Sequence, residues 1–425
     1  MSEKITHSKN FDKRPFFFRI LNAAWEGTYV FGTKIKLEKD DLIRSARKRT
    51  GLQDFGKEFR EEPLEKLLVS VNEEAMLHPV GRFITRERFI SLLSMRLRAE
   101  YFFKKFPEIL EQEIYPAWII IGLQRTGTTK LQRLLSADPD HRFIPSWEVI
   151  NPLPLDPNLY SHQRTNSPTH QLDKRLKIAR TSVRAVKFMS PGFYAIHPID
   201  IHEPEEDILL LDVSFLSTTP EAMMHVPSYA NWIEQTDQSE AYAYAAKLLK
   251  LLQWFRPAKR WVLKTPHHLE FPDLIEKHFG EVHFLWPHRS IYESVPSFLS
   301  MVTYTHMMFS DQVDEKRIAG HWVRKTGYML QKALDYRMRD NNQAKFTDIY
   351  YKDLIRDSVT ELSRIYEQNG GLTPELIAGF RQHELEHPHR KHGIHQYSLA
   401  DFHLTENDID QQTSRYQSFL KSIYG

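Results

Sequence analysis

The chain has 425 residues, 41% of them hydrophobic, and is long enough for one large α/β domain with an appendage or for two domains. Lys and Arg total 57 against 55 acidic residues, a formal net charge of +2, which argues against bulk binding of nucleic acid or membranes. Cysteine is absent, which excludes disulfides, thiol nucleophiles and cysteine-ligated metals. The N-terminus lacks a signal-peptide pattern and no apolar run suits a transmembrane segment, so we expect a cytoplasmic protein.

Residues 1–115 are expected to form a helical N-terminal extension packed on the core. Residues 11–31 are rich in aromatic side chains and could form an amphipathic helix that packs on its own domain or on a partner subunit, with a membrane surface as the alternative. Residues 40–51 start with acidic residues and stop at Gly51, as helices often do. Apolar residues recur three and four positions apart in 63–77 and 86–106, which predicts two further helices.

The most informative stretch is 117–135. An unbroken apolar run at 117–121 predicts a strand buried on both faces, and Gly122 ends it. From Thr128 onward, leucines recur at helical spacing. A strand, a short loop and a helix start form an anion site, because the first helical N–H groups lack partners and the helix dipole favours negative charge there.

The loop in this stretch resembles a Walker A sequence only in part. Gly122 and Gly127 have the required spacing, but Thr128 stands where the lysine should be, which counts against an ATPase or kinase. Arg125 supplies a cation inside the loop instead. An ordinary strand-to-helix turn is the alternative interpretation.

The rest of the chain alternates between strands and helices. We expect strands at 143–145, 260–264, 282–286 and 346–350, and helices at 239–255, 291–302, 319–336, 353–368 and 374–383. A Pro-rich loop at 145–157 precedes a polar, poorly periodic segment, 160–228, that we place near a ligand pocket, and the tail from residue 387 is expected to be rich in loops. This order predicts an α/β fold with a mainly parallel sheet flanked by helices.

Two later groups of residues are suited to a second phosphate. Arg289 ends a predicted strand and Ser297 lies eight residues on; a guanidinium binds phosphate bidentately and a hydroxyl adds a neutral donor. Pairing of Arg289 with Glu293 is the alternative. Near the C-terminus, PHRKHGIHQYS contributes Arg390 and Lys391; its histidines could hold a metal, but their spacing matches no known zinc pattern.

Together these motifs resemble those of sulfotransferases that use 3′-phosphoadenosine 5′-phosphosulfate (PAPS). QRTGTT at 124–129 looks like their 5′-phosphosulfate loop, Arg289 and Ser297 look like their 3′-phosphate pair, and the C-terminal segment is similar to the RKG-type loop that closes over that phosphate, with His392 displacing Gly393 by one place. The resemblance implies a sulfotransferase domain at 116–425 with a P-loop-like phosphosulfate-binding loop, PAPS as co-substrate and no metal. The residues that it assigns to PAPS are Arg125, Thr126, Gly127, Thr128, Thr129, Arg289, Ser297, Arg390, Lys391 and Gly393.

The general base has two candidates. Glu148 lies in a region where protein-tyrosine and some carbohydrate sulfotransferases place a catalytic Glu. Lys264 with His267 or His268 resembles the KTHLP segment of cytosolic sulfotransferases, in which the Lys touches the sulfate and the His is the base, although Pro266 and one extra residue interrupt it here. We expect Glu148 to be the base and His267 to be the second choice.

The predicted reaction is in-line transfer of a sulfuryl group from PAPS to a hydroxyl or amine of a small-molecule, sugar or lipid acceptor, releasing adenosine 3′,5′-bisphosphate. A homo-oligomer is conceivable, and no nucleic acid is expected as a partner. A degenerate P-loop phosphotransferase or NTPase and a catalytically inactive nucleotide-binding scaffold are the alternatives. The acceptor itself is left open; the residues expected near it are Trp147, Tyr160, Phe193, Tyr194, Glu205, Glu206, Asp207 and His225.

Overall fold

A computed structural model describes residues 5–6, 15–31, 34–155, 174–339, 341–367, 370–386 and 395–424. Its centre is a five-stranded sheet with the order β3-β4-β2-β5-β6, in which all neighbouring strands run parallel. These strands are β2 (Ala117–Ile120), β3 (His141–Arg142), β4 (Arg260–Lys264), β5 (Val282–His288) and β6 (Phe346–Tyr350). The predicted parallel sheet is therefore confirmed. A separate parallel pair joins β1 (Ile5–Thr6) to β7 (His395–Gln396).

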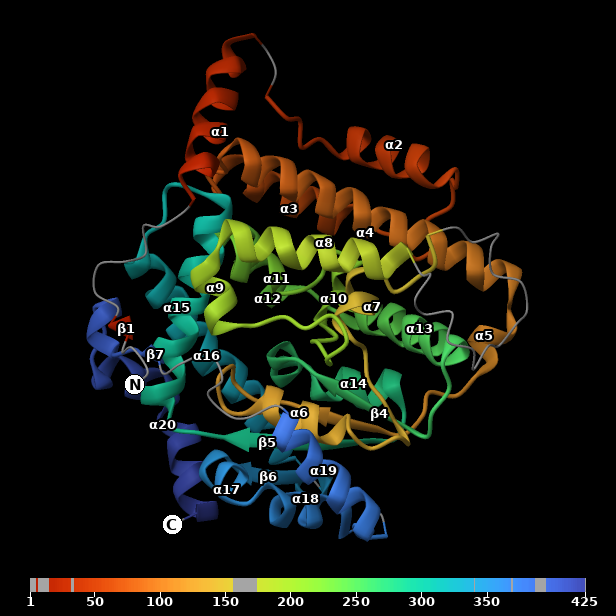
Figure 1. Ribbon diagram of the computed structural model, residues 1–425, viewed down its shortest axis with the longest axis vertical. Coiled ribbons are helices and arrows are strands. Elements are labelled where there is room, and N and C mark those ends of the chain that lie inside the picture. The colour runs from red at the N-terminus through yellow and green to blue at the C-terminus, as the bar shows by residue number, and fades with distance from the viewer. Residues whose placement is uncertain are drawn as a thin grey trace.

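Helices cover both faces of the sheet (Figure 1). Because side chains alternate along a strand, Trp118 and Ile120 of β2 belong to one buried cluster and Ala117 and Ile119 to another. The first cluster includes residues of α6 (Thr128–Leu135), α17 (Tyr351–Arg356), α18 (Ser358–Tyr366) and α19 (Pro374–Glu386). The second includes residues of α13 (Ser239–Phe255), α14 (Pro272–Phe279), α15 (Ile291–Phe309), α16 (Glu315–Arg337) and α20 (Glu406–Tyr424).

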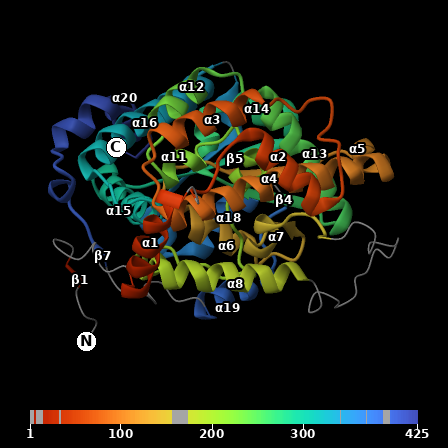
Figure 2. The same cartoon turned by 90° about the horizontal axis from the view of Figure 1, so that it is seen from above.

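The N-terminal part forms a helical layer, as predicted. It contains α1 (Phe16–Gly27), the 3₁₀ turn Thr28–Phe31, α2 (Lys39–Thr50), α3 (Glu62–Glu73), α4 (Pro79–Lys105) and α5 (Glu108–Glu111). Leu42 of α2 and Leu97 of α4 are buried in the same cluster as Leu248 of α13 and Ile119 of β2, so this layer shares the core of the sheet. Figure 2 shows the layer from above. The boundary between residues 115 and 116 stays a prediction.

Some expectations for the middle of the chain were wrong. The edge strand is β3, because residues 143–145 leave the sheet: the N–H of Glu205 donates to the carbonyl of Ile144, and Pro145 forms an antiparallel bridge with Pro204. The predicted loop contains α7 (Ser146–Ile150). For the segment 160–228 no helix or strand was predicted. Its described part contains α8 (Lys174–Met189), α9 (Pro191–Ile196), α10 (Ile208–Asp212), α11 (Thr219–Met223) and α12 (Pro227–Gln235).

The C-terminal part also differs. The helix expected at 353–368 is two helices, α17 and α18, because Asp357 breaks the first and caps the second by accepting from the N–H of Thr360. The loop-rich tail ends in α20, whose buried residues Ile409, Tyr416 and Phe419 show helical spacing. Among all the helices described, none has the length and apolar character needed to cross a bilayer.

Candidate active site

The loop after β2 is held in shape by its own residues. The hydroxyl of Thr126 donates to the carbonyl of Leu123 over 2.7 Å. Gly127 has a φ of +96°, and a Cβ there would lie 2.7 Å from the ring of Tyr351, so only glycine fits. Arg125 adopts a φ of +69°, an uncommon conformation for a residue with a side chain. The loop leads into α6 at Thr128, as the sequence predicts.

Arg125 is a partly buried cation with neutral partners. Its Nε donates to Oγ of Ser297 over 3.1 Å, and its Nη1 lies 3.5 Å from the carbonyl oxygen of Ile196. Burial lowers the pKa of Arg125, an effect to which the nearby Arg289 adds. Within the described ranges no carboxylate forms an ion pair with Arg125. A desolvated guanidinium of this kind is suited to bind an anion.

Arg289 lies beside the same loop. Its Nη1 donates to the carbonyl oxygen of Arg125 over 3.1 Å, and its guanidinium stacks 4.6 Å from the ring centre of Tyr351. The alternative partner weighed above is also present: Nε and Nη2 contact one carboxylate oxygen of Glu293, at 2.9 and 2.8 Å. Glu293 is more than half exposed, and exposed ion pairs are weak, so an anionic ligand could displace it.

The structure thus brings Arg125, Arg289 and Ser297 together, although they come from different elements. Arg390, Lys391 and Gly393, the third predicted group, lie outside the described residues. Their role in phosphate binding stays a prediction.

A cavity of about 350 Å³ adjoins the loop at Gln124 and the end of β4 at Thr265 and His267. Ligands of parallel α/β sheets bind at this carboxyl edge of the strands. Most of the lining is apolar; it includes Val149, Ile150, Val183, Val186, Phe193, Ile199, Ile208, Leu209, Met223, Phe298, Met301, Val302 and Trp322. Of the acidic residues expected near the acceptor, Glu205 and Glu206 line the cavity. Of the three proposed aromatic residues that the structure describes, Phe193 lines it and Trp147 and Tyr194 do not. Tyr160 lies outside the described residues.

Two residues at the end of β4 have distinct surroundings. Lys264 is buried and its Nζ lies 2.8 Å from Oε1 of Glu206, a cavity-lining carboxylate. His267 is buried, its Nε2 lies 3.2 Å from the side-chain oxygen of Gln238, and its Nδ1 has no hydrogen-bond partner among the described residues. Burial holds the pKa of His267 well below its usual value, so the imidazole is neutral and can accept a proton.

The neighbouring His268 has no free ring nitrogen. Its Nε2 lies 2.7 Å from a carboxylate oxygen of Asp207, and its Nδ1 lies 3.0 Å from the hydroxyl of Tyr242. These contacts fix His268 in the core. Of the two adjacent histidines, His267 is the one that lines the cavity.

Glu148 is buried but does not line the cavity. Its Oε2 lies 2.6 Å from Nη2 of Arg142 and 2.7 Å from Nη2 of Arg256. Burial alone would raise the pKa of Glu148, but Arg142, Arg256 and Arg175 outweigh it and hold the pKa below its usual value. These contacts favour a structural role, and the assignment of Glu148 as general base stays a prediction.

Comparison with known proteins decides the family. Residues 116–372, more than half of the chain, match the sequence model of the sulfotransferase family. The chain belongs to this family. The enzyme accordingly transfers a sulfuryl group to a small-molecule acceptor, and the family implies PAPS as the donor.

Individual relatives come from mycobacteria. The enzyme is 23% identical, over 71% of its length and 75% of the relative's, to omega-hydroxy-beta-dihydromenaquinone-9 sulfotransferase Stf3 of Mycobacterium bovis. The crystal structure of sulfotransferase STF1 from Mycobacterium tuberculosis matches with a TM-score of 0.76 and 28% identity, covering 88% of this chain and 98% of that one. Sulfotransferase STF9 from Mycobacterium avium shares the fold, with a TM-score of 0.79, 24% identity and coverage of 89% and 96%.

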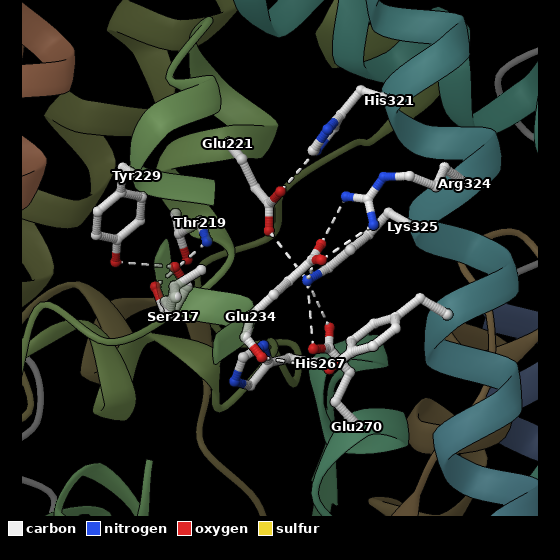
Figure 3. Close-up of polar contacts among 12 residues, drawn as sticks. Ser217, Thr219, Glu221, Tyr229, Glu234, His267, Glu270, His321, Arg324 and Lys325 are labelled. Atoms are coloured by element: carbon white, nitrogen blue, oxygen red, sulfur yellow. Dashed lines mark hydrogen bonds and ion pairs between the residues drawn. The ribbon is translucent and has the colours of Figure 1, made fainter. Parts of the chain in front are cut away.

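A buried cluster of charges around Lys325 was not expected from the sequence (Figure 3). The ammonium group of Lys325 is fully buried and contacts Glu270 at 3.0 Å, Glu234 at 3.2 Å and Glu221 at 3.7 Å. Burial, with Glu221 nearby, raises the pKa of Glu270 to about 7 despite Lys325. His321 contacts Glu221 at 2.6 Å. No motif could reveal this cluster, because its carboxylates come from three separate segments.

Proposed function

We propose that the loop at 122–129 binds the 5′-phosphosulfate of PAPS and that Arg289 and Ser297 bind its 3′-phosphate. The observation that carries the proposal is the cation Arg125, which is partly buried beside the start of α6 and hydrogen-bonded to neutral groups. Backbone N–H groups of 126–129 and the hydroxyls of Thr128 and Thr129 would complete the phosphosulfate site. Arg390, Lys391 and Gly393 would close over the 3′-phosphate.

For the acceptor we propose a hydrophobic molecule that carries a terminal hydroxyl. The cavity between the loop and α8 is lined mainly by aliphatic and aromatic side chains, and its polar lining includes Gln124 of the loop and Thr265 at the end of β4. Such a cavity would bury an apolar chain and leave its polar end at the loop. The similar mycobacterial enzyme is named for a hydroxylated menaquinone, which has this chemical character.

We propose His267 as the general base, in place of the earlier preference for Glu148. The acceptor oxygen forms a bond to sulfur, the bond from sulfur to the phosphate oxygen breaks, and the acceptor proton passes to Nδ1 of His267. Adenosine 3′,5′-bisphosphate leaves with the negative charge that Arg125 and the loop N–H groups stabilise. Lys264 now contacts Glu206. When the donor binds, its ammonium group would also contact the sulfuryl group, and its contact with Glu206 would weaken.

Transfer of labelled sulfate from PAPS to long-chain primary alcohols tests this proposal. The enzyme should form one labelled sulfate ester of the alcohol and one adenosine 3′,5′-bisphosphate per turnover, and Arg125→Ala should form neither. Arg356→Ala, which alters an exposed arginine on α17, serves as the control and should keep full activity. Transfer to short polar alcohols with none to long-chain ones would contradict the acceptor assignment while leaving the donor assignment intact.

A further inference from the structure

Helix α8 has a charge distribution unlike that of the whole chain. Its sixteen residues include six cations and no acidic residue, whereas the protein has a formal net charge of only +2. Five of the cations are exposed: Lys174, Lys177, Arg180, Arg184 and Lys187. None of these five forms an ion pair with another residue of the described ranges. They make a local positive surface that no carboxylate of the described protein neutralises.

The two sides of α8 differ. The inner side carries Arg175, Leu176 and Ala179, which are buried, and Val183 and Val186, which line the acceptor cavity. On the outer side, Ile178 and Phe188 are exposed among the cations, and Phe188 has 53% of its surface accessible. A helix with cations and large apolar side chains on its outer side has the composition of helices that lie in the headgroup region of a bilayer.

Helix α1 adds apolar surface on the same side of the molecule. Phe16 is 76% exposed, and Ile20 and Leu21 are also exposed, while Phe18 and Asn22 face inward. In Figures 1 and 2, α1 stands next to the end of α8 from which α9 continues. Helix α1 therefore adds exposed apolar residues next to α8.

We propose that the outer sides of α8 and α1 bind an anionic phospholipid bilayer. The cations of α8 attract the negative headgroups, and the exposed apolar side chains enter the interface between headgroups and acyl chains. Charge complementarity favours an anionic bilayer as the partner, because a neutral bilayer or a purely apolar protein surface would leave the cations of α8 without counter-charges. Since the inner side of α8 lines the cavity, this surface would place the acceptor site next to the membrane.

Sedimentation with vesicles tests the surface, using full-length protein without donor or acceptor. The protein should bind vesicles of phosphatidylcholine mixed with phosphatidylglycerol and show little binding to phosphatidylcholine alone. Raising the salt concentration should weaken the binding, since mobile ions screen the cations. The triple variant Arg180→Glu, Arg184→Glu, Lys187→Glu should lower the affinity at least about tenfold.

A matched variant, Lys66→Glu, Lys316→Glu, Lys332→Glu, makes the same change in charge on exposed positions of α3 and α16 and should bind vesicles as the unchanged protein does. Phe16→Ser with Phe188→Ser should weaken binding without a change in charge. Equal binding to both vesicle types, equal effects of the two triple variants, or binding of duplex DNA in place of vesicles would overturn the proposal. The assay needs no PAPS, so its outcome is independent of the proposed function, and bisphosphate binding by the α8 variant reports that it is folded.

Discussion

Nε of Arg125 donates a hydrogen bond to Oγ of Ser297 across 3.1 Å, joining two residues 172 positions apart in the chain. One belongs to the loop after β2 and the other to the helix after β5, and β2 and β5 are neighbours in the sheet. The contact therefore ties the two predicted phosphate sites to each other. It also gives Ser297 a function in the protein without ligand, which is to hold the Arg125 side chain in place.

Ser297→Ala should weaken binding of adenosine 3′,5′-bisphosphate by about tenfold or more. The substitution removes a hydrogen bond to a charged group, which is worth about 1.5–3 kcal/mol, as well as a proposed phosphate ligand. Isothermal titration calorimetry measures the change. The control is Ser294→Ala on the same helix α15, where the hydroxyl donates to the carbonyl oxygen of Ile291; it should leave the affinity unchanged, and an equal loss in both variants would point to damage to the helix and not to the site.

His267→Gln should lower kcat by about 10²–10⁴-fold while the bisphosphate still binds, because it removes the proposed proton acceptor and leaves the phosphate ligands in place. Its low pKa keeps the imidazole neutral in the folded protein, so the acidic limb of the activity profile should lie below the usual histidine value of 6.5. Single-turnover rates across pH provide the measurement. An acidic limb that persists unchanged in the Gln variant would assign the base elsewhere.

Protonation of His267 also affects stability. Its pKa is lower in the folded than in the unfolded protein, so the unfolded state binds more protons as the pH falls below 6.5. This histidine therefore favours folding above that pH, and the contribution is lost in acid. We expect the free energy of unfolding of His267→Gln, measured with urea, to decrease less between neutral and acidic pH than that of the unchanged protein.

Glu148→Gln should reduce stability more than turnover. The substitution removes the negative charge that pairs with buried Arg142 and with Arg256, and breaking one side of a buried ion pair costs about 3–5 kcal/mol. Denaturant unfolding and kcat per folded molecule separate the two effects. Full stability combined with lost turnover would restore Glu148 as the general base.

Lys325→Met should be among the most destabilising single substitutions, with a cost of about 3–5 kcal/mol, because it leaves Glu221, Glu234 and Glu270 without their shared cation. Glu270→Gln should cost much less. A folded pKa of about 7 for Glu270 exceeds its unfolded value, so its contribution is present in acid and is lost as the pH rises to 7. The Gln variant should lack that pH dependence in thermal unfolding; an identical profile would contradict the assignment.

The sequence predicted those structural elements that are determined by residues close together in the chain. The strand, the loop with Gly122 and Gly127 and the helix from Thr128 follow from neighbouring residues, and the structure places them as expected. Of the two alternatives given for Arg289, the pairing with Glu293 occurs in the structure, whereas its role in phosphate binding stays a prediction. The hydrogen bond from Arg289 to the carbonyl of Arg125 was not predicted.

The sequence could not reveal contacts between residues that lie far apart in the chain. Lys325 reads as an ordinary cation on a long helix until α11, α12 and the turn Pro266–Glu270 bring three carboxylates to it. Glu148 looked catalytic because the arginines that bind it, Arg142 and Arg256, were not recognisable as its partners. The lining of the apolar cavity comes from several helices that lie far apart in the sequence, among them α7, α8, α11 and α15, so no local pattern reveals it.

The most direct test of the account is calorimetric titration of the protein with adenosine 3′,5′-bisphosphate, the proposed product. We expect one site per chain that also stabilises the protein, by about 2.7 kcal/mol at one hundred times the dissociation constant. Arg125→Ala should lower the affinity at least tenfold, an amount of about 1.4 kcal/mol. Absence of binding by the unchanged protein, or equal binding by Arg125→Ala, would contradict the central claim that Arg125 and the loop after β2 hold the sulfuryl donor.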